Sequence, residues 1–188
     1  MWSANFFFVV VALMLMPMAA SAGTEHSVNP DIGTHTWKRT SDSVTYSLTQ
    51  ILPDQLRAFY AGRGFPADVI ESYATSCVFM TVVRNDHEDG EITFSTSNWS
   101  LATEGTIRPL KGTRQWLSDW LAQGVMKPQL IAFEWAQFPT QQSYQPGDWN
   151  QGMLAMNLSA GESFNLNLEW MHKGKVFKGI LEEVRCAS

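Results

Sequence analysis

The chain contains 188 residues, of which 16% are charged, and its formal net charge is −5. Acidic and basic residues are interspersed, so we exclude nucleic acid as a partner and expect no basic patch for an anionic membrane surface. The length fits one domain that buries a core of its own.

Residues 1–22 have the pattern of a secretory signal peptide. An uncharged apolar run over residues 6–16 is followed by Pro17, and Ala20, Ser21 and Ala22 match the small-residue cleavage pattern. The run is shorter than the roughly 20 apolar residues that a membrane-spanning helix needs. It is preceded by no Lys or Arg, and a retained N-terminal anchor is the alternative. We predict a periplasmic or secreted protein with no membrane span after signal removal.

Residues 23–42 are expected to form a flexible leader, and residues 43–188 a single β-rich domain. The leader is polar and contains Pro30, Gly33 and two histidines, His26 and His35. The apolar residues of 43–51 mostly alternate with polar neighbours, which predicts the first strand of the domain.

Two short helices are expected after this strand. Pro53 and Pro66 each suit the first turn of a helix, and Gly62 ends the first one. This helical hairpin leads into residues 76–84, a run rich in Val, Phe and Thr that predicts a strand buried on both faces. Residues 85–90 have the composition of a hairpin loop.

A third helix is predicted over residues 112–123, where Trp116 and Trp120 belong to one apolar stripe. From residue 130 onward the pattern indicates strands. Apolar residues alternate with polar or small ones at Ile131, Phe133 and Trp135, at Leu154, Met156 and Leu158, and at Phe164, Leu166, Leu168 and Trp170. Lys173 and Gly174 suit a hairpin turn into a last strand over residues 176–184. We therefore predict an α+β, β-rich fold: a mostly antiparallel sheet or β-sandwich with a helical hairpin and one further helix packed on it.

The only two cysteines, Cys77 and Cys186, are expected to form a disulfide bond. Two cysteines in an exported chain favour pairing, although two free buried thiols are the alternative. Closing a loop of this length contributes about 3–5 kcal/mol in the chain-entropy model.

Several common catalytic motifs are absent from the sequence. It contains no C-x-x-C pair, no H-E-x-x-H helix, no Walker loop and no G-x-S-x-G elbow. A Ser-His-Asp triad stays open, because its members need not be close in sequence.

Two groups of residues resemble metal ligands. The acidic segment over residues 86–91 lacks the spacing of a calcium loop, and a solvated turn explains it more simply. The set Met153, Met156, Met171 and His172 has the soft donors that copper prefers, but methionine packing in the core explains it more simply. His26 and His35 of the leader are possible additional ligands, and the case for them is weaker still. We expect neither a metal nor another cofactor.

The preferred ligand-binding site is the segment that contains Tyr144, Asp148, Trp149, Asn150 and Gln151. The Pro-Gly pair at residues 146–147 forces a turn that presents an aromatic ring between hydrogen-bonding side chains, an arrangement suited to a sugar or a peptide. The alternative is that Trp149 covers the end of the core.

The sequence favours an exported, non-catalytic binding or accessory protein, whose partner is a protein or a small-molecule ligand. A periplasmic copper-handling protein is the second hypothesis, and a hydrolase with an unrecognised site is the third. Methionine sulfurs that converge with His172 would favour the second hypothesis. Polar residues that converge in a deep cleft would favour the third.

Overall fold

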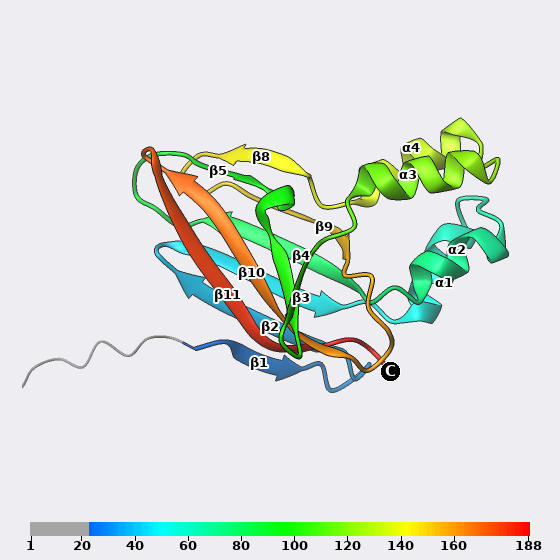
Figure 1. The fold of residues 1–188 in the computed structure, drawn as a ribbon, viewed down its shortest axis with the longest axis horizontal. Helices are drawn as coiled ribbons and strands as arrows, with labels where there is room; N and C mark the ends of the chain where they lie inside the picture. Colours follow the sequence, from blue (N-terminus) through cyan, green and yellow to red (C-terminus); the bar gives the residue numbers. More distant parts are fainter. Residues whose placement is uncertain (1–22) are drawn as a thin grey trace, which may run out of the picture.

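The computed structural model describes residues 23–188 and consists of two antiparallel sheets packed face to face, with four helices at one end (Figure 1). This confirms the predicted α+β, β-rich fold and selects the sandwich. The predicted signal peptide, residues 1–22, lies outside the described residues.

The first sheet has the strand order β1-β2-β3-β4-β9, and every neighbouring pair is antiparallel. Val44, Tyr46 and Leu48 of β3 are buried against the second sheet, as their alternation predicts. The strands are β1 (Glu25–Val28), β2 (His35–Ser41), β3 (Val44–Gln50), β4 (Val78–Asn85) and β9 (Trp149–Ala155).

Residues 23–42 are not a flexible leader, because they supply two strands of this sheet. Trp37 of β2 is buried in the core between the sheets and contacts Phe79 edge-on. β2 pairs with β3 along almost its whole length, from Thr36 opposite Thr49 to Ser41 opposite Val44. The polar composition of this segment reflects an edge of the sheet with one face in solvent rather than an absence of structure.

The second sheet is centred on β10, which pairs with β11 on one side and with β5 and β6 on the other. The alternating residues of β10, from Phe164 to Trp170, are buried as predicted, and Lys173 and Gly174 form the turn into β11. The strands are β5 (Ile92–Ser95), β6 (Ser100–Thr103), β7 (Thr106–Pro109), β8 (Gln141–Tyr144), β10 (Ser163–His172) and β11 (Lys175–Arg185), with a short 3₁₀ turn, η1 (Thr96–Asn98), between β5 and β6.

Residues 85–90 do not form the predicted hairpin loop, because β4 and β5 belong to different sheets. The segment crosses from the first sheet to the second and is held by Asn85, which is fully buried. The Asn85 side-chain amide donates to the carbonyl oxygens of Gly90 at 3.1 Å and Tyr144 at 3.0 Å. Turn-prone composition identified an irregular segment but gave no information on which strands it joins.

The disulfide between Cys77 and Cys186 is confirmed, with a Cα–Cα distance of 5.2 Å. Cys77 lies immediately before β4 with a φ of 60°, and Cys186 immediately after β11. The bond therefore links the two sheets next to the end that carries the helices.

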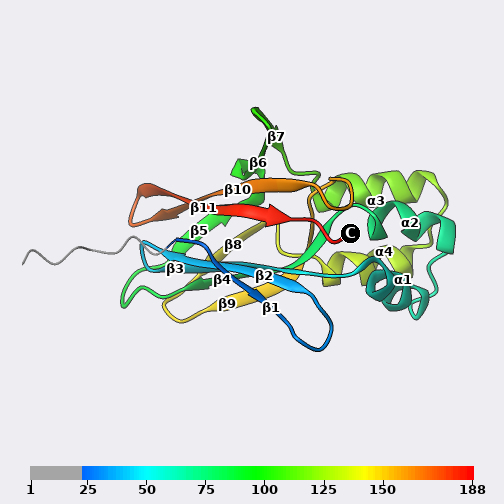
Figure 2. The ribbon, with the colours of Figure 1, turned by 90° about the horizontal axis from the view of Figure 1, so that it is seen from below.

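The helices are two insertions that meet beyond the same end of the sandwich (Figures 1 and 2). α1 (Pro53–Ala61) and α2 (Ala67–Ala74) connect β3 to β4, whereas α3 (Thr113–Ala122) and α4 (Lys127–Ala136) connect β7 to β8. The first three match the predicted helices. Together the four enclose a second core that is rich in aromatic rings, among them Tyr60, Tyr73, Trp116, Trp120 and Phe133.

The strand predicted at Ile131, Phe133 and Trp135 is wrong, because these residues lie in α4. Pro128 lies in the first helical turn, and the Gln129 side chain accepts a hydrogen bond from the Met126 main-chain nitrogen at 2.9 Å. Phe133 is buried whereas Trp135 is 85% exposed, so the alternation does not mark one buried face. Leu158 also lies outside its predicted strand, since β9 ends at Ala155.

Within residues 23–188, none of the helices has both the length and the apolar character needed to cross a membrane.

Candidate functional site

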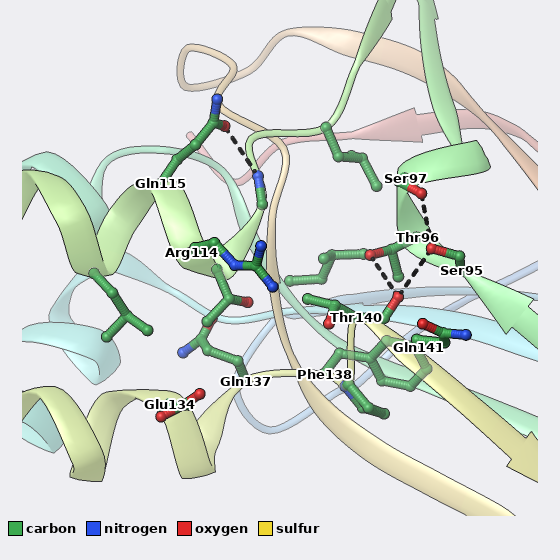
Figure 3. Close-up of a pocket in the computed structure, with 16 residues that line it drawn as sticks. Ser95, Thr96, Ser97, Arg114, Gln115, Glu134, Gln137, Phe138, Thr140 and Gln141 are labelled. Atoms are coloured by element: carbon green, nitrogen blue, oxygen red, sulfur yellow. Dashed lines mark hydrogen bonds between the residues drawn. The ribbon is translucent and has the colours of Figure 1, made fainter.

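An open hollow of about 700 Å³ lies where α3 and α4 meet the second sheet (Figure 3). We call it the helix–sheet pocket. Its lining comes from four separate parts of the chain: the end of β5 with η1, the start of α3, the segment from the end of α4 to β8, and Leu154 of β9. The volume falls within the range of small-molecule sites.

The wall next to β5 presents hydroxyl groups in fixed positions. The Ser95 and Ser97 hydroxyls are 2.7 Å apart, and the Thr96 main-chain nitrogen donates to the Thr140 carbonyl oxygen at 2.9 Å. The Thr96 hydroxyl also reaches this carbonyl, at 3.4 Å. These bonds tie η1 to the chain between α4 and β8, so the hydroxyls are ordered before any ligand binds.

The opposite wall is the first turn of α3. Gly112 precedes the helix, and its main-chain nitrogen donates to the Gln115 side-chain oxygen at 3.3 Å. The main-chain N–H groups of Thr113 and Arg114 have no acceptor among the described residues. Helix starts carry partial positive charge, so this wall favours negative charge in a ligand.

Two charged side chains, Arg114 and Glu134, line the pocket from α3 and α4. The Arg114 guanidinium extends into the hollow (Figure 3), and no carboxylate within residues 23–188 lies at ion-pair distance from it. Arg114 is the one cationic side chain of the lining. An unpaired guanidinium retains its five N–H donors for a ligand.

The lower side of the pocket is held rigidly through Gln137. Its side-chain oxygen accepts from the Tyr73 hydroxyl at 2.8 Å, and its nitrogen donates to the Tyr60 hydroxyl at 3.0 Å. Burial raises the pKa of both phenols. Phe138 and Leu154 supply the apolar surface beside this network.

The described lining can be characterised by its functional groups. It offers hydroxyls, amides, one guanidinium and one carboxylate, and it contains no imidazole and no thiol. A hydroxyl nucleophile needs an adjacent base, and acid–base hydrolysis commonly uses two carboxylates. Neither arrangement occurs among these residues.

The five residues predicted as a ligand site surround the β8–β9 turn, at the end of the sandwich opposite the helices (Figure 1). Tyr144 ends β8 and is buried, and burial together with the Asp148 charge raises its pKa. Asp148 caps the turn by accepting from the Gln145 main-chain nitrogen at 2.9 Å. Trp149, Asn150 and Gln151 begin β9 instead of belonging to a loop.

Trp149 is 57% exposed and sits directly across from Arg84 of β4. Its indole is therefore not a plug over the core. None of the five predicted residues lines the helix–sheet pocket. Their role in binding stays a prediction that is separate from this pocket.

The four soft donors are not brought together. Met153 packs in the helical core beside Tyr60, whereas Met156 lies in the core between the sheets. Met171 and His172 are adjacent on β10 and point to opposite faces, the first exposed and the second buried. Alternation along a strand and a boundary between two cores separate residues that are close in sequence.

The acidic segment after β4 is engaged in contacts with the protein. Asp86 pairs with Arg84 and accepts a hydrogen bond from the Thr45 hydroxyl. Asp89 pairs with Lys173 at 2.7 Å, which lowers its pKa. Within residues 23–188 no group of three or more His, Cys, Asp or Glu side chains is arranged to hold a metal ion.

Sequence reasoning missed the helix–sheet pocket altogether. Ser95, Arg114 and Thr140 belong to separate segments that come together only when the α3–α4 insertion folds back onto the second sheet. Because the sequence analysis predicted a strand where α4 lies, it did not predict this insertion as a pair of helices. The helix α3 was predicted from the sequence, and the first N–H groups of any helix lack a partner within the helix. These N–H groups were the one feature of the sequence that could have pointed to a binding site here.

No protein-family model, curated protein or solved structure matches this chain. The class of protein is therefore defined by its own fold and site. It is a disulfide-linked β-sandwich with a four-helix cap and an open polar pocket beneath part of that cap.

Proposed function

We propose that this chain is an exported, non-catalytic binding protein whose helix–sheet pocket holds a small molecule that carries a carboxylate group. The observation that carries the proposal is the unpaired Arg114 guanidinium, which extends into a pocket lined by ordered hydroxyls.

Three sets of groups in the pocket favour an anionic ligand, because they carry positive charge or can donate hydrogen bonds. Arg114 offers a planar fork of donors that matches a carboxylate. The N–H groups at the start of α3 reinforce it from the same wall. The Ser95 and Thr96 hydroxyls face these groups and complement the polar remainder of a small ligand.

Export is supported by the disulfide and by the sequence of residues 1–22. Disulfide bonds persist in oxidising compartments, and Cys77 and Cys186 are paired. The apolar run and the small residues at positions 20–22 fit a signal that is removed on export. We propose a periplasmic or secreted location on these grounds.

A thermal-shift screen tests the ligand class directly. The mature protein is mixed with a panel of small carboxylates and with the matching amides, which have the same shape without the charge. A carboxylate that binds should raise the melting temperature, whereas its amide should not. The affinity of each hit is then measured by calorimetry.

Arg114→Ala should weaken the binding of such a hit by about 10- to 100-fold, the range expected for losing hydrogen bonds between charged groups. Arg63→Ala is the matched control, because Arg63 lies just after α1, stacks on Phe59 and is outside the pocket lining. Equal binding of carboxylates and amides, or unchanged affinity in Arg114→Ala, would reject the proposal.

A further inference from the structure

Two histidines from the first two strands lie in direct contact on the inner side of the first sheet. His26 is opposite Trp37 in the β1–β2 pairing, and His35 lies two residues before Trp37, so all three side chains share one face. The Nε2 atom of His26 is 2.9 Å from the Nδ1 atom of His35. Both rings stack near Trp37, with centroid distances of 4.9 and 5.7 Å.

These histidines line a second open hollow of about 690 Å³, between the β1–β2 hairpin and the ends of β10 and β11. The imidazole of His26 is exposed and that of His35 is half-buried, so an ion in solvent can reach both. Glu183 and Arg185 of β11 line the far side. This hollow shares no lining residue with the helix–sheet pocket.

We propose that His26 and His35 form a binding site for a copper(II) ion, with His26 Nε2 and His35 Nδ1 as adjacent ligands. Their hydrogen bond requires that one of these two nitrogens carry a proton. On binding, that proton moves to the other nitrogen of the same ring by exchange with water. The two rings then turn about their side-chain bonds until both lone pairs point to the ion, and no electron is transferred.

The imidazole ligands favour copper(II) over zinc, because copper(II) binds a given nitrogen site most tightly among the common divalent first-row ions. Two ligands at about 2.05 Å from an ion are about 2.9 Å apart when they subtend a right angle, and about 3.3 Å apart in a tetrahedron. The observed 2.9 Å is the length of the hydrogen bond between the two rings, and it already brings the nitrogens as close as two adjacent ligands at a right angle. Copper(II) prefers this square-planar or tetragonal geometry.

In the proposed site, water molecules fill the remaining equatorial positions of the copper ion. No third His, Cys, Asp or Glu within the described residues is placed to complete the set. The site is therefore open, exchangeable and weaker than a closed structural metal centre.

The other histidine pair provides an internal control. His87 and His172 stack face to face, with ring centroids 3.7 Å apart and an angle of 6° between the rings. Imidazole lone pairs lie in the ring plane, so two parallel stacked rings cannot direct both toward one ion. The two pairs share a residue type but differ in ring geometry and in burial, since His172 is buried and His26 is exposed.

The mature protein is titrated with copper(II) chloride in a buffer that does not coordinate metals, and binding is followed by calorimetry and electron paramagnetic resonance. We expect one ion per chain and hyperfine splitting from two imidazole nitrogens. His26→Ala and His35→Ala should each lower the affinity at least tenfold, and zinc should bind more weakly than copper. The double variant His87→Ala, His172→Ala should bind as the parent does.

His35→Ala is the decisive variant, because copper held by His26 together with the amino terminus of the mature chain would survive it. Retained binding in His35→Ala would overturn the proposal, as would no binding to the parent protein or loss of binding in the His87, His172 double variant. Circular dichroism of each variant ensures that the compared proteins are folded.

Discussion

The main chain of Phe138 lies directly against Gly152, so closely that a methyl carbon at position 152 would overlap the Phe138 nitrogen and α-carbon. The Phe138 nitrogen also donates to the Met153 carbonyl oxygen at 2.8 Å. This contact fastens the segment after α4 to β9 and positions Phe138 in the helix–sheet pocket.

Gly152→Ala should therefore destabilise the protein by about 1–3 kcal/mol, because the methyl group meets main-chain atoms that cannot rotate away. Gly62→Ala is the matched control. Gly62 has a helical φ of −62° and its nearest neighbour would be 3.5 Å from the new carbon, so this change should raise stability by up to about 1 kcal/mol. Urea denaturation of both variants measures the difference. Equal stability of the two variants would mean that the Phe138 segment shifts freely.

Removing the disulfide should have a larger effect. Cys77 and Cys186 are 109 positions apart, and the chain-entropy model assigns about 3–5 kcal/mol to closing a loop of this size. The double variant Cys77→Ala, Cys186→Ala should show this loss in denaturant titrations. The parent protein in excess reductant should show a similar loss, and no change under reduction would contradict the model.

Stability should fall as the pH drops from 7 toward 5, because of His87. Burial, reinforced by repulsion from His172, lowers the pKa of His87 below its ordinary value of 6.5. The unfolded chain then takes up a proton near pH 6.5, while the folded protein resists it until a lower pH, so acidification favours unfolding. Asp89, whose pKa is lowered by Lys173, affects stability only below about pH 4.

The His87→Gln variant should lose part of this pH dependence between pH 7 and 5, measured as the change in melting temperature. His172→Gln should raise the His87 pKa in an NMR titration, because the repulsive partner is gone. A pH profile identical in His87→Gln and the parent would assign the effect to other groups.

Trp149→Ala should change the free energy of unfolding by less than about 1 kcal/mol, since the indole is 57% exposed. Trp120→Ala gives the comparison, because Trp120 is fully buried in the helical core and its loss should cost about 3–5 kcal/mol. If Trp149 also contacts a partner, Trp149→Ala will weaken that binding without a change in melting temperature. A large drop in melting temperature for Trp149→Ala would contradict its exposed position.

The sequence predicted those elements whose pattern is local. Alternation over Phe164 to Trp170 located β10, and proline followed by an apolar stripe located α1 and α2. The same logic failed for α4, where alternation at Ile131, Phe133 and Trp135 outweighed the helix-start signal of Pro128. Short apolar segments fit both periods, and tertiary contacts decide between them.

The candidate sites could not be predicted in the same way, because they depend on contacts between distant segments. Arg114 reaches the Ser95 wall only when the α3–α4 insertion folds back onto the second sheet. His26 meets His35 only because β1 turns back onto β2 in one register. The sequence named both histidines as possible metal ligands but could not show that they meet, because this depends on the register of β1 on β2.

The bond between Cys77 and Cys186 also turns residues 77–186 into a covalent ring that contains α3 and α4, while α1 and α2 lie outside it. A protease that cuts the exposed α3–α4 turn near Gly124 would therefore leave two fragments joined through sulfur. The nicked chain should run as one band in a non-reducing gel and as two bands after reduction. A cut in the α1–α2 turn near Gly64 would fall outside the ring and release the amino-terminal fragment from covalent attachment.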